Sequence, residues 1–293
     1  MVGAQVVGQF PGRVPQVRAV RLRHSGYEHR PLGRIPPGRI GLQGTPGLRA
    51  VHRAHTTRIP FENLDPHRGV PVSLAAEDLQ QKLVARRRGG YCFEQNLLLA
   101  AALEALGADV EYMLARVRSG APAGTVRPRS HLALKVTSEG QTWLADVGFG
   151  TGTLLEPIPY GPGGTYEQAG WRFRVVTEGG ELVLQAMDTS GVWNDLYAFA
   201  AEPVPRVDLE VSSWFTGTHP GSPFVTGLVV SIRGEDGTQL GLSDWSGTLT
   251  LTASTPEVST ANEVTWPEVP ELLADRFGLP GFGLGRDGRL TAA

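Results

Sequence analysis

The sequence predicts an α+β fold in which helices come first, strands follow, and a mixed segment closes the chain. Periodic apolar residues near the start indicate helices, and alternating, β-branched runs in the middle indicate antiparallel strands. Toward the C-terminus both patterns occur together. The length of 293 residues is enough for one or two hydrophobic cores. With 41% hydrophobic and 19% charged residues, the composition excludes a disordered chain.

Three helices are predicted in the first half of the chain. Leu48–Arg58 places apolar residues on one face, and the next segment, 59–66, is irregular because two prolines interrupt it. A second helix begins at Ser73, whose hydroxyl can cap it. The clearest helix is Cys92–Leu106, which is dense in Leu and Ala and ends at Gly107.

The rest of the chain alternates between strand patterns and two further helices. We expect helices at 208–215 and 268–277, the second ending at a glycine. Residues 1–40, rich in Pro, Gly and Arg, are expected to form loops with short helical pieces. The predicted strands are 110–118, 131–136, 141–147, 171–177, 181–186, 224–232 and 248–252.

Composition also limits the partners and the compartment. A formal charge of -2 gives no argument for a nucleic-acid partner. Up to Arg58 the only acid is Glu28, and this basic segment is read as a solvated tail rather than a lure for an acidic ligand. No apolar run approaches the roughly 20 residues that a membrane span needs, and no signal peptide is evident. A single cysteine favours a reducing, cytoplasmic setting.

Cys92 follows two glycines and opens a predicted helix. Glycines permit a sharp turn and the close approach of a substrate. A helix N-terminus favours a thiolate, and its free backbone N–H groups, at Cys92 or beside it, can receive an oxyanion. The competing interpretation is a buried structural cysteine, the commoner role of a free thiol.

His131 and Asp146 are candidate partners for this cysteine. If a four-residue loop, 137–140, joins the two strands, His131 and Asp146 lie directly opposite each other. A two-residue turn at Glu139-Gly140 shifts the partner by two positions but keeps both side chains on one face, whereas a three-residue loop would separate them. A paired His and Asp is the base and its orienting acid in a catalytic triad. The three residues therefore form a Cys–His–Asp hypothesis.

Other polar features have weaker signals. His52 and His55 have a helical spacing that can bind metal, but no Cys or acid joins them, so we expect a structural role and no metal. Glu94 is expected to support the cysteine loop, through an arginine or through the loop backbone, and Asn63 to brace the segment beneath the site. The run Gly148–Gly152 either cradles a pyrophosphate through its amides or is a flexible exit from a strand.

Four segments together resemble the arylamine N-acetyltransferase family, and the actinobacterial type in particular. The resemblance runs from about Gly38 to Gly278, with the motifs in the family's order and spacing. Residues 1–37 depart from the family pattern and form an atypical N-terminal extension. The segments are Arg88–Glu94 (RGGYCFE), Ile59–Asp65 (IPFENLD), Asp146–Gly150 (DVGFG) and Ser213–Pro220 (SWFTGTHP).

The resemblance implies a three-part architecture with a papain-like cysteine-enzyme core. Residues 38–107 would form a helical bundle carrying the nucleophile. Residues 108–205 would form an antiparallel β-barrel-like domain carrying His131 and Asp146, and residues 206–293 an α/β lid.

The resemblance also implies an activity: acetyl transfer from acetyl-CoA, through Cys92, to a small aromatic amine, hydrazine or hydroxylamine. Phe61, Phe149 and Phe215 would line the acceptor pocket. Gly150, Thr151 and Gly152 would contact the CoA pyrophosphate. Two alternatives stay open: a macrolactam-forming amide synthase that acts on a polyketide thioester with the same triad, and a non-catalytic binding module. The oligomeric state is not predicted.

Overall fold

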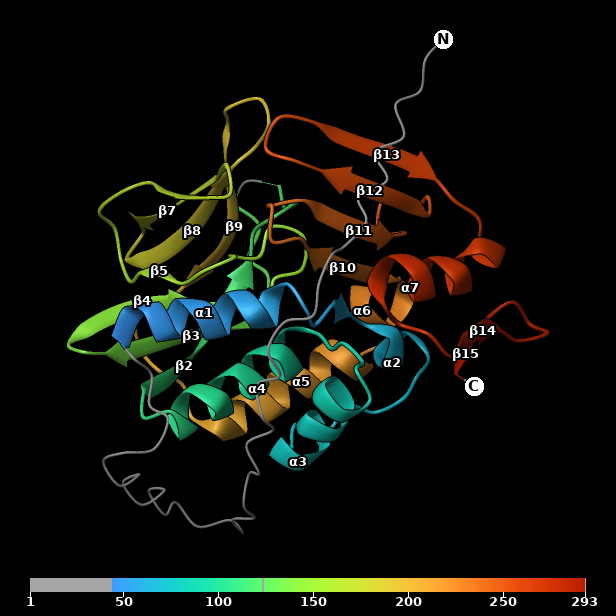
Figure 1. The fold of residues 1–293 in the computed structure, drawn as a ribbon, viewed down its shortest axis with the longest axis horizontal. Helices are drawn as coiled ribbons and strands as arrows, with labels where there is room; N and C mark the ends of the chain where they lie inside the picture. The colour runs from blue at the N-terminus through green and yellow to red at the C-terminus, as the bar shows by residue number, and fades with distance from the viewer. Residues whose placement is uncertain (1–43, 123, 293) are drawn as a thin grey trace.

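The computed structural model describes residues 44–122 and 124–292. The expectations for residues 1–40 and for the N-terminal extension 1–37 lie outside this range. The predicted α+β class is confirmed: helices occur together with an eight-stranded sheet and a five-stranded sheet (Figure 1). None of the described helices is long and apolar enough to cross a membrane.

The predicted helices are present, with some boundaries moved. Ser73 does not cap the second helix: it accepts a hydrogen bond from the Ala75 N–H (3.3 Å) and donates one to Asp78 (2.6 Å), and the helix begins one residue after Ala75. The first half of the chain contains α1 Gly44–Thr56, α2 Leu64–His67, α3 Ala76–Leu79, the π-helical turn η1 Gln80–Ala85 and α4 Cys92–Ala105. The second half contains α5 Arg206–Thr218, α6 Pro223–Thr226, the 3₁₀ turn η2 Trp266–Glu268 and α7 Val269–Phe277.

Helix α4 is buried along most of its length, which explains its dense Leu and Ala content. It begins at Cys92, and Gly107 follows its end with a φ of 92°, a conformation that glycine adopts at little cost. Its apolar residues share one core with α1 and with Leu209 of α5. Helix α5 therefore packs with the bundle, although its sequence range falls within the segment assigned to the lid.

The eight-stranded antiparallel sheet has the strand order β5-β4-β3-β2-β9-β8-β7-β6. The predicted hairpin around Gly179-Gly180 is present as β7 and β8. Strands β5, β6 and β9 were not predicted from the sequence. The bounds are β2 Asp109–Val117, β3 Arg129–Ser138, β4 Gln141–Ala145, β5 Ile158–Pro159, β6 Tyr166–Gln168, β7 Trp171–Glu178, β8 Glu181–Met187 and β9 Trp193–Phe199.

The hairpin of β3 and β4 has the two-residue turn, not the four-residue loop. Ser138 pairs with Gln141, and both turn residues have positive φ, 51° for Glu139 and 75° for Gly140. This geometry matches the right-handed twist of a tight hairpin. The direct opposition of His131 and Asp146 is therefore wrong, because the register shifts the partner by two positions, but both side chains remain on one face.

The five-stranded sheet has the order β1-β10-β11-β12-β13 and is packed against α7. Its edge strand β1 comes from the IPFENLD segment, so the first half of the chain contributes to the C-terminal sheet. The predicted strand 224–232 is wrong over its first part, because Ser222 caps α6 by accepting from the Phe224 N–H. The bounds are β1 Phe61–Glu62, β10 Val229–Arg233, β11 Gln239–Ser243, β12 Thr250–Ser254 and β13 Ser259–Glu263, with a separate hairpin of β14 Phe282–Leu284 and β15 Leu290–Ala292.

Gly148, just after β4, is where the eight-stranded sheet meets the start of α4. A Cβ at Gly148 would lie 2.8 Å from the Cys92 Cα and 2.8 Å from the Asn96 Nδ2. We predict that Gly148→Ala pushes these elements apart and destabilises the fold by about 1–3 kcal/mol. Thermal unfolding followed by circular dichroism measures the change.

Gly283→Ala is the matched control, because its Cβ would find the nearest atom, Thr291 Oγ1, at 3.7 Å. Equal melting temperatures for Gly148→Ala and Gly283→Ala would contradict the prediction.

Candidate active site

His131 and Asp146 meet in a buried ion pair. His131 lies on β3, Asp146 follows β4, and His131 Nε2 is 2.8 Å from Asp146 Oδ2. Their side chains are 3% and 1% exposed, so water does not screen the contact. The predicted pairing of these two residues is confirmed, although the register that produces it differs from the simplest one.

Cys92 is brought to the same place by α4. It is the first residue of the helix, its side chain is buried, and its Sγ lies 3.6 Å from the Ser130 carbonyl oxygen, one residue before His131. The Cys92 side chain is also close enough to His131 to raise the pKa of the imidazole ring. Because His131 uses Nε2 for Asp146, the ring's other nitrogen is the one available to the sulfur. The three predicted residues therefore converge on one imidazole ring.

The electrostatics of this group favour a protonated His131. Burial alone lowers the pKa of His131, but the Asp146 carboxylate and the Cys92 side chain together raise it well above its ordinary value. Burial alone would raise the pKa of the Asp146 carboxyl. The opposing effects of His131, Asn96 and the Gly148 N–H are larger, so the pKa of Asp146 lies below its ordinary value. The ring is thus held as an imidazolium beside the Cys92 sulfur.

Asp146 is held from three further directions that sequence reasoning missed. Asn96 Nδ2 and the Gly148 N–H both donate to Oδ1 at 2.9 Å. The Asp146 backbone N–H donates to His52 Nε2 at 3.1 Å, and His52 Nδ1 lies 3.1 Å from the Leu155 carbonyl oxygen, to which it donates. Asn96 lies one helical turn after Cys92 on α4, and that spacing was the available signal.

His52 and His55 have separate structural partners and do not form a pair. His55 Nε2 is 2.6 Å from Gln95 Oε1 on α4, whereas His52 faces Asp146. The structural interpretation of these residues is therefore supported. No group of three or more His, Cys, Asp and Glu side chains suited to a metal is found within residues 44–122 and 124–292.

An aromatic wall covers the imidazole. Phe149 meets the His131 ring edge to face, with centroids 5.2 Å apart, and Tyr197 of β9 packs at 4.7 Å. Both rings also contact each other. Tyr197, fully buried beside Asp146, belongs to an unpredicted strand and was not identified from the sequence. These rings exclude water from His131 and strengthen its interaction with Asp146.

The three phenylalanines assigned to an acceptor pocket lie in different surroundings. Phe149 touches His131, and Phe61 lies on β1, where it bridges to Gly90 and faces Gly150. Phe215 of α5 stacks on His219 with centroids 4.5 Å apart. Phe224, which the sequence did not suggest, meets Phe61 edge to face at 6.1 Å. Phe61 and Phe149 thus flank the loop beside the cysteine, and the place of Phe215 in a shared pocket stays a prediction.

The loop of Gly150, Thr151 and Gly152 presents backbone at the surface beside this wall. Gly150 and Gly152 have φ values of 83° and 99°, which explains the glycines. The neighbouring amides are occupied, with Phe149 N donating to Thr153 Oγ1 at 2.7 Å and Thr153 N to the Gly150 carbonyl. Such a loop can offer its remaining N–H groups to a phosphate.

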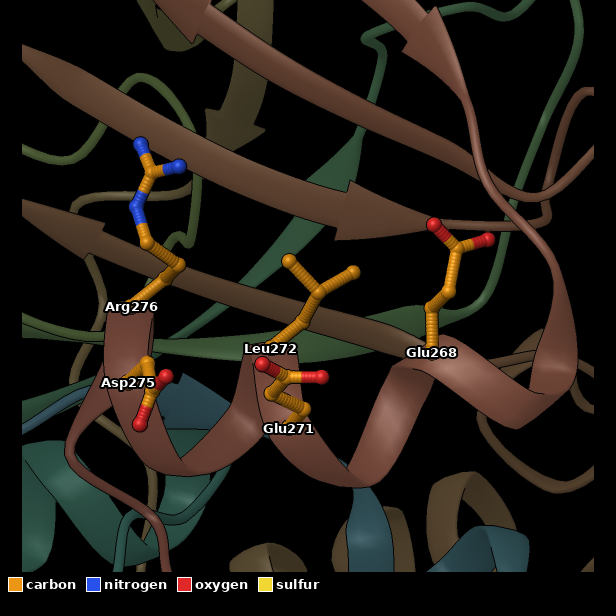
Figure 2. Close-up of a pocket in the computed structure, with 5 residues that line it drawn as sticks. All are labelled: Glu268, Glu271, Leu272, Asp275 and Arg276. Atoms are coloured by element: carbon orange, nitrogen blue, oxygen red, sulfur yellow. The ribbon is translucent and has the colours of Figure 1, made fainter.

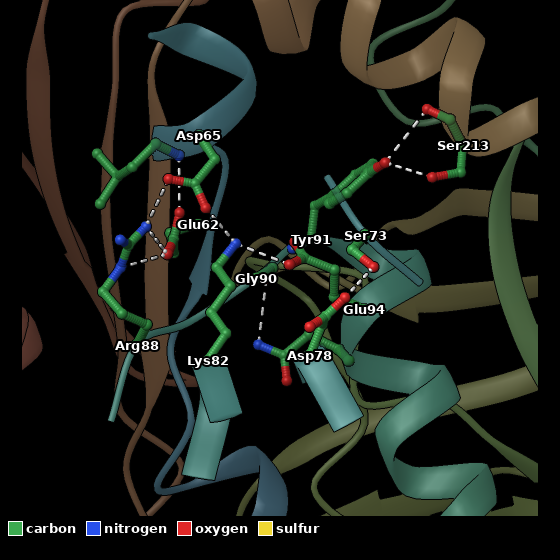
Figure 3. A network of polar contacts seen from close by, with 12 residues as sticks. Glu62, Asp65, Ser73, Asp78, Lys82, Arg88, Gly90, Tyr91, Glu94 and Ser213 are labelled. Atoms are coloured by element: carbon green, nitrogen blue, oxygen red, sulfur yellow. Dashed lines mark hydrogen bonds and ion pairs between the residues drawn. The ribbon is translucent and has the colours of Figure 1, made fainter. Parts of the chain in front are cut away.

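The loop before Cys92 is fixed by a buried ionic network (Figure 3). Lys82 Nζ binds Glu94 (2.7 Å) and Asp65 (2.6 Å), and Arg88 binds Glu62 (2.7 Å) and Asp65 (3.1 Å). Glu94 also accepts from the Tyr91 N–H, so it supports the loop backbone as expected, with a lysine in place of the suggested arginine.

Asn63 braces the neighbouring segment. Its Nδ2 donates to the carbonyls of Phe224 (2.8 Å) and Gly227 (2.7 Å), and its Oδ1 accepts from the Val229 N–H (2.8 Å). Asn63 therefore ties the IPFENLD segment to α6 and β10.

A surface depression along η2 and α7 does not belong to this site. Figure 2 shows its side chains, which all come from consecutive turns of this helical segment. None of the residues proposed for the site from the sequence is among them, and three of the five are acids. The lining residues are Glu268, Glu271, Leu272, Asp275 and Arg276.

His52 gives the fold a dependence on pH. Burial lowers the pKa of His52 from 6.5 to about 4, so the unfolded chain takes up the proton first as the pH falls. Neutral His52 therefore stabilises the folded state above pH 6.5. This stabilisation, about 3 kcal/mol in the free energy of unfolding, is lost as the pH falls from 6.5 toward 4. We predict that His52→Gln, which keeps a donor and an acceptor but does not titrate, shows a shallower loss of melting temperature over this range.

The exposed His219 offers a control, since His219→Gln should keep the wild-type slope. If His52→Gln and the wild type lose stability in parallel between pH 6.5 and 4, the assignment of this slope to His52 is wrong.

Comparisons with known proteins agree with this site. A family model described as N-acetyltransferase matches residues 46–280. An arylamine N-acetyltransferase of Mycolicibacterium smegmatis is 45% identical over 207 residues, which cover 68% of this chain and 75% of that protein. A Salmonella typhimurium protein named arylamine N-acetyltransferase / N-hydroxyarylamine O-acetyltransferase is 33% identical over 243 residues, 82% of this chain and 84% of that one.

Solved structures extend the likeness to the fold. The structure of the Mycobacterium marinum arylamine N-acetyltransferase in complex with CoA aligns with a TM-score of 0.75 at 39% identity, covering 80% of this chain and 86% of that one. The predicted fold class and the resemblance are both confirmed by these matches. Since they span most of the chain, it belongs to the arylamine N-acetyltransferase family.

Proposed function

We propose that this enzyme transfers an acetyl group from acetyl-CoA, through an acetyl-cysteine at Cys92, to an aromatic amine, hydrazine or hydroxylamine. The observation that carries the proposal is the convergence of Cys92 and Asp146 on the two sides of the His131 ring. Family membership supports the acyltransfer reaction, and the M. marinum relative's structure with CoA supports the donor.

In the first half-reaction, His131 holds the proton as an imidazolium and the Cys92 thiolate attacks the thioester carbonyl. The carbon–sulfur bond to CoA breaks as the new thioester forms, so CoA leaves as a thiol after taking a proton from His131. Asp146 keeps the ring oriented and stabilises its positive charge. The first backbone N–H groups of an α-helix have no acceptor within the helix, so the N–H of Cys92, the first residue of α4, is the candidate oxyanion donor.

The second half-reaction reverses the roles. Acetylation removes the negative charge on Cys92, one of the groups that raises the pKa of His131, so the ring gives up its proton more readily. The neutral ring can then accept a proton from the amine as it attacks the acetyl-cysteine. The amide leaves, the thiol is regenerated, and the expected kinetics are ping-pong.

The surrounding residues suit the two substrates. The Gly150–Gly152 loop would hold the pyrophosphate of CoA through its amides. Phe61 and Phe149 flank that loop and would stack on an aryl ring, while Phe215 would close the pocket from α5. The aromatic wall would also keep water from the acetyl-cysteine, which hydrolysis would otherwise destroy. A reduced Cys92 is required throughout, so we place the enzyme in the cytoplasm.

The two alternatives are less well supported. A macrolactam-forming synthase would use the same triad, but the relatives described above are named for acetyl transfer to arylamines. A non-catalytic binding module would have no need of the buried His131–Asp146 ion pair, and burying such a pair has a desolvation cost. Neither alternative is favoured.

The acyl-enzyme provides the most direct test. Incubation with acetyl-CoA, without an amine, should add one acetyl group to the peptide containing Cys92, as read by mass spectrometry. Later addition of an aromatic amine should remove that group and yield the amide in one turnover. Cys92→Ala should show neither event, and amide formation by Cys92→Ala would end the proposal.

The role of Asp146 can be tested separately. Asp146→Asn removes the charge that keeps His131 protonated while its Oδ1 contacts are largely retained, so we predict a fall in kcat of at least about a hundredfold. The exposed Asp188→Asn is the control and should leave kcat unchanged. Wild-type turnover in Asp146→Asn would show that the carboxylate is only structural.

A further inference from the structure

Arg233, at the end of β10, is a buried cation without an ionic partner. Its residue is 4% exposed, and its Nη1 donates to the Thr153 carbonyl. Nε and Nη2 are buried and have no hydrogen-bond partner, and within residues 44–122 and 124–292 no carboxylate forms an ion pair with it. These two N–H groups lie on the same edge of the guanidinium, the edge that binds carboxylates in a bidentate manner.

A second unpaired donor lies next to it. Gln239 of β11 is the cross-strand partner of Arg233, so their side chains stand on the same face of the sheet. Gln239 is 8% exposed, and its Nε2 is also buried without a partner. The neighbourhood therefore offers several N–H donors and lacks the acceptor that would satisfy them.

Arg233 also lines a small cavity beside the 150–153 loop. The same cavity is lined by Phe61 and Gly150, the residues assigned to the acceptor and to CoA, and by Thr153 and Ser231. On the far side, the guanidinium lies 5.6 Å from the centroid of the Trp171 ring and 5.7 Å from that of Phe173. Aromatic faces attract a cation but do not provide a hydrogen-bond acceptor in the plane of the fork.

A buried charge without an ionic partner is unfavourable, and an anion at the free guanidinium edge would compensate it. We propose that Arg233 and Gln239 form a binding subsite for a carboxylate, which the free guanidinium edge holds through two parallel N–H bonds and the Gln239 amide through a third. Burial, with a smaller contribution from the charge of Arg53, lowers the pKa of Arg233 to about 9, as expected when the compensating anion is absent.

The carboxylate can come from two sources. A small free carboxylate would be a resident ion that completes the contact between β10 and the 150–153 loop. Alternatively, the carboxylate is part of the substrate, such as an aminobenzoate whose amine faces Cys92. The second source rests on the proposed function, and the first does not.

Binding is tested on the full chain without any turnover. Sodium formate should raise the melting temperature of the wild type by about 3 °C over sodium chloride at the same ionic strength, through preferential binding to the folded state. Arg233→Met, which removes the unpaired charge and keeps an apolar stem against the rings, should be at least as stable as the wild type without formate and should lose the formate response.

Gln239→Glu is the matched variant, because it places a carboxylate opposite the guanidinium. It should melt above the wild type in buffer without formate and should no longer respond to formate. An equal formate response in the wild type and Arg233→Met would overturn the proposal, as would a chloride effect as large as that of formate.

A steady-state comparison distinguishes the two sources. If the substrate supplies the carboxylate, Arg233→Met should lower kcat/KM for 4-aminobenzoate about tenfold or more and leave that for the neutral 4-aminobenzamide unchanged. If formate stabilises the wild type but kcat/KM falls for neither amine, the subsite holds a free ion. Loss of activity in the wild type itself would refute the proposed function and leave the formate measurement valid.

Discussion

The contact on which the site depends is the buried hydrogen bond between His131 and Asp146. A carboxylate at 1% exposure is stable only if its lone pairs and its neighbourhood are satisfied, and here the two oxygens take His131, Asn96 and the Gly148 N–H. Those donors come from β3, from α4 and from the turn after β4. The hydrogen bonds of the Asp146 carboxylate therefore fix the position of α4 against the eight-stranded sheet. Helix α4 in turn places Cys92.

A second layer of constraint holds the loop before Cys92. Lys82 and Arg88 form ion pairs with three acids from the IPFENLD segment and from α4. Burial alone would lower the pKa of each cation, but the neighbouring carboxylates raise it. Removing one member would leave a buried charge unpaired, which typically costs about 3–5 kcal/mol. Motifs that stand 20 residues or more apart in the sequence are thus parts of one structure, which explains why they occur together.

The convergence of Cys92, His131 and Asp146 could be predicted because the signals are local: a cysteine at a helix start, and a histidine and an aspartate in one hairpin. The exact register could not, since it depended on whether Glu139 would adopt a positive φ. His52, Asn96 and Tyr197 were missed for a different reason. The sequence around each of them is that of an ordinary core residue. Only the packing of α1, α4 and β9 around β3 and β4 brings these side chains to His131 and Asp146.

Two buried arginines, Arg88 and Arg233, differ in how their charge is compensated. Arg88 is enclosed by Glu62 and Asp65, so its charge is compensated within the chain. Arg233 is more deeply buried but has one carbonyl and two aromatic rings, which leave a bidentate edge unused beside the cavity of Phe61 and Gly150. A methionine or leucine would fill the same space without the desolvation cost of a cation. A guanidinium at this place is understandable if an anion compensates its charge, which is the role proposed above for a carboxylate.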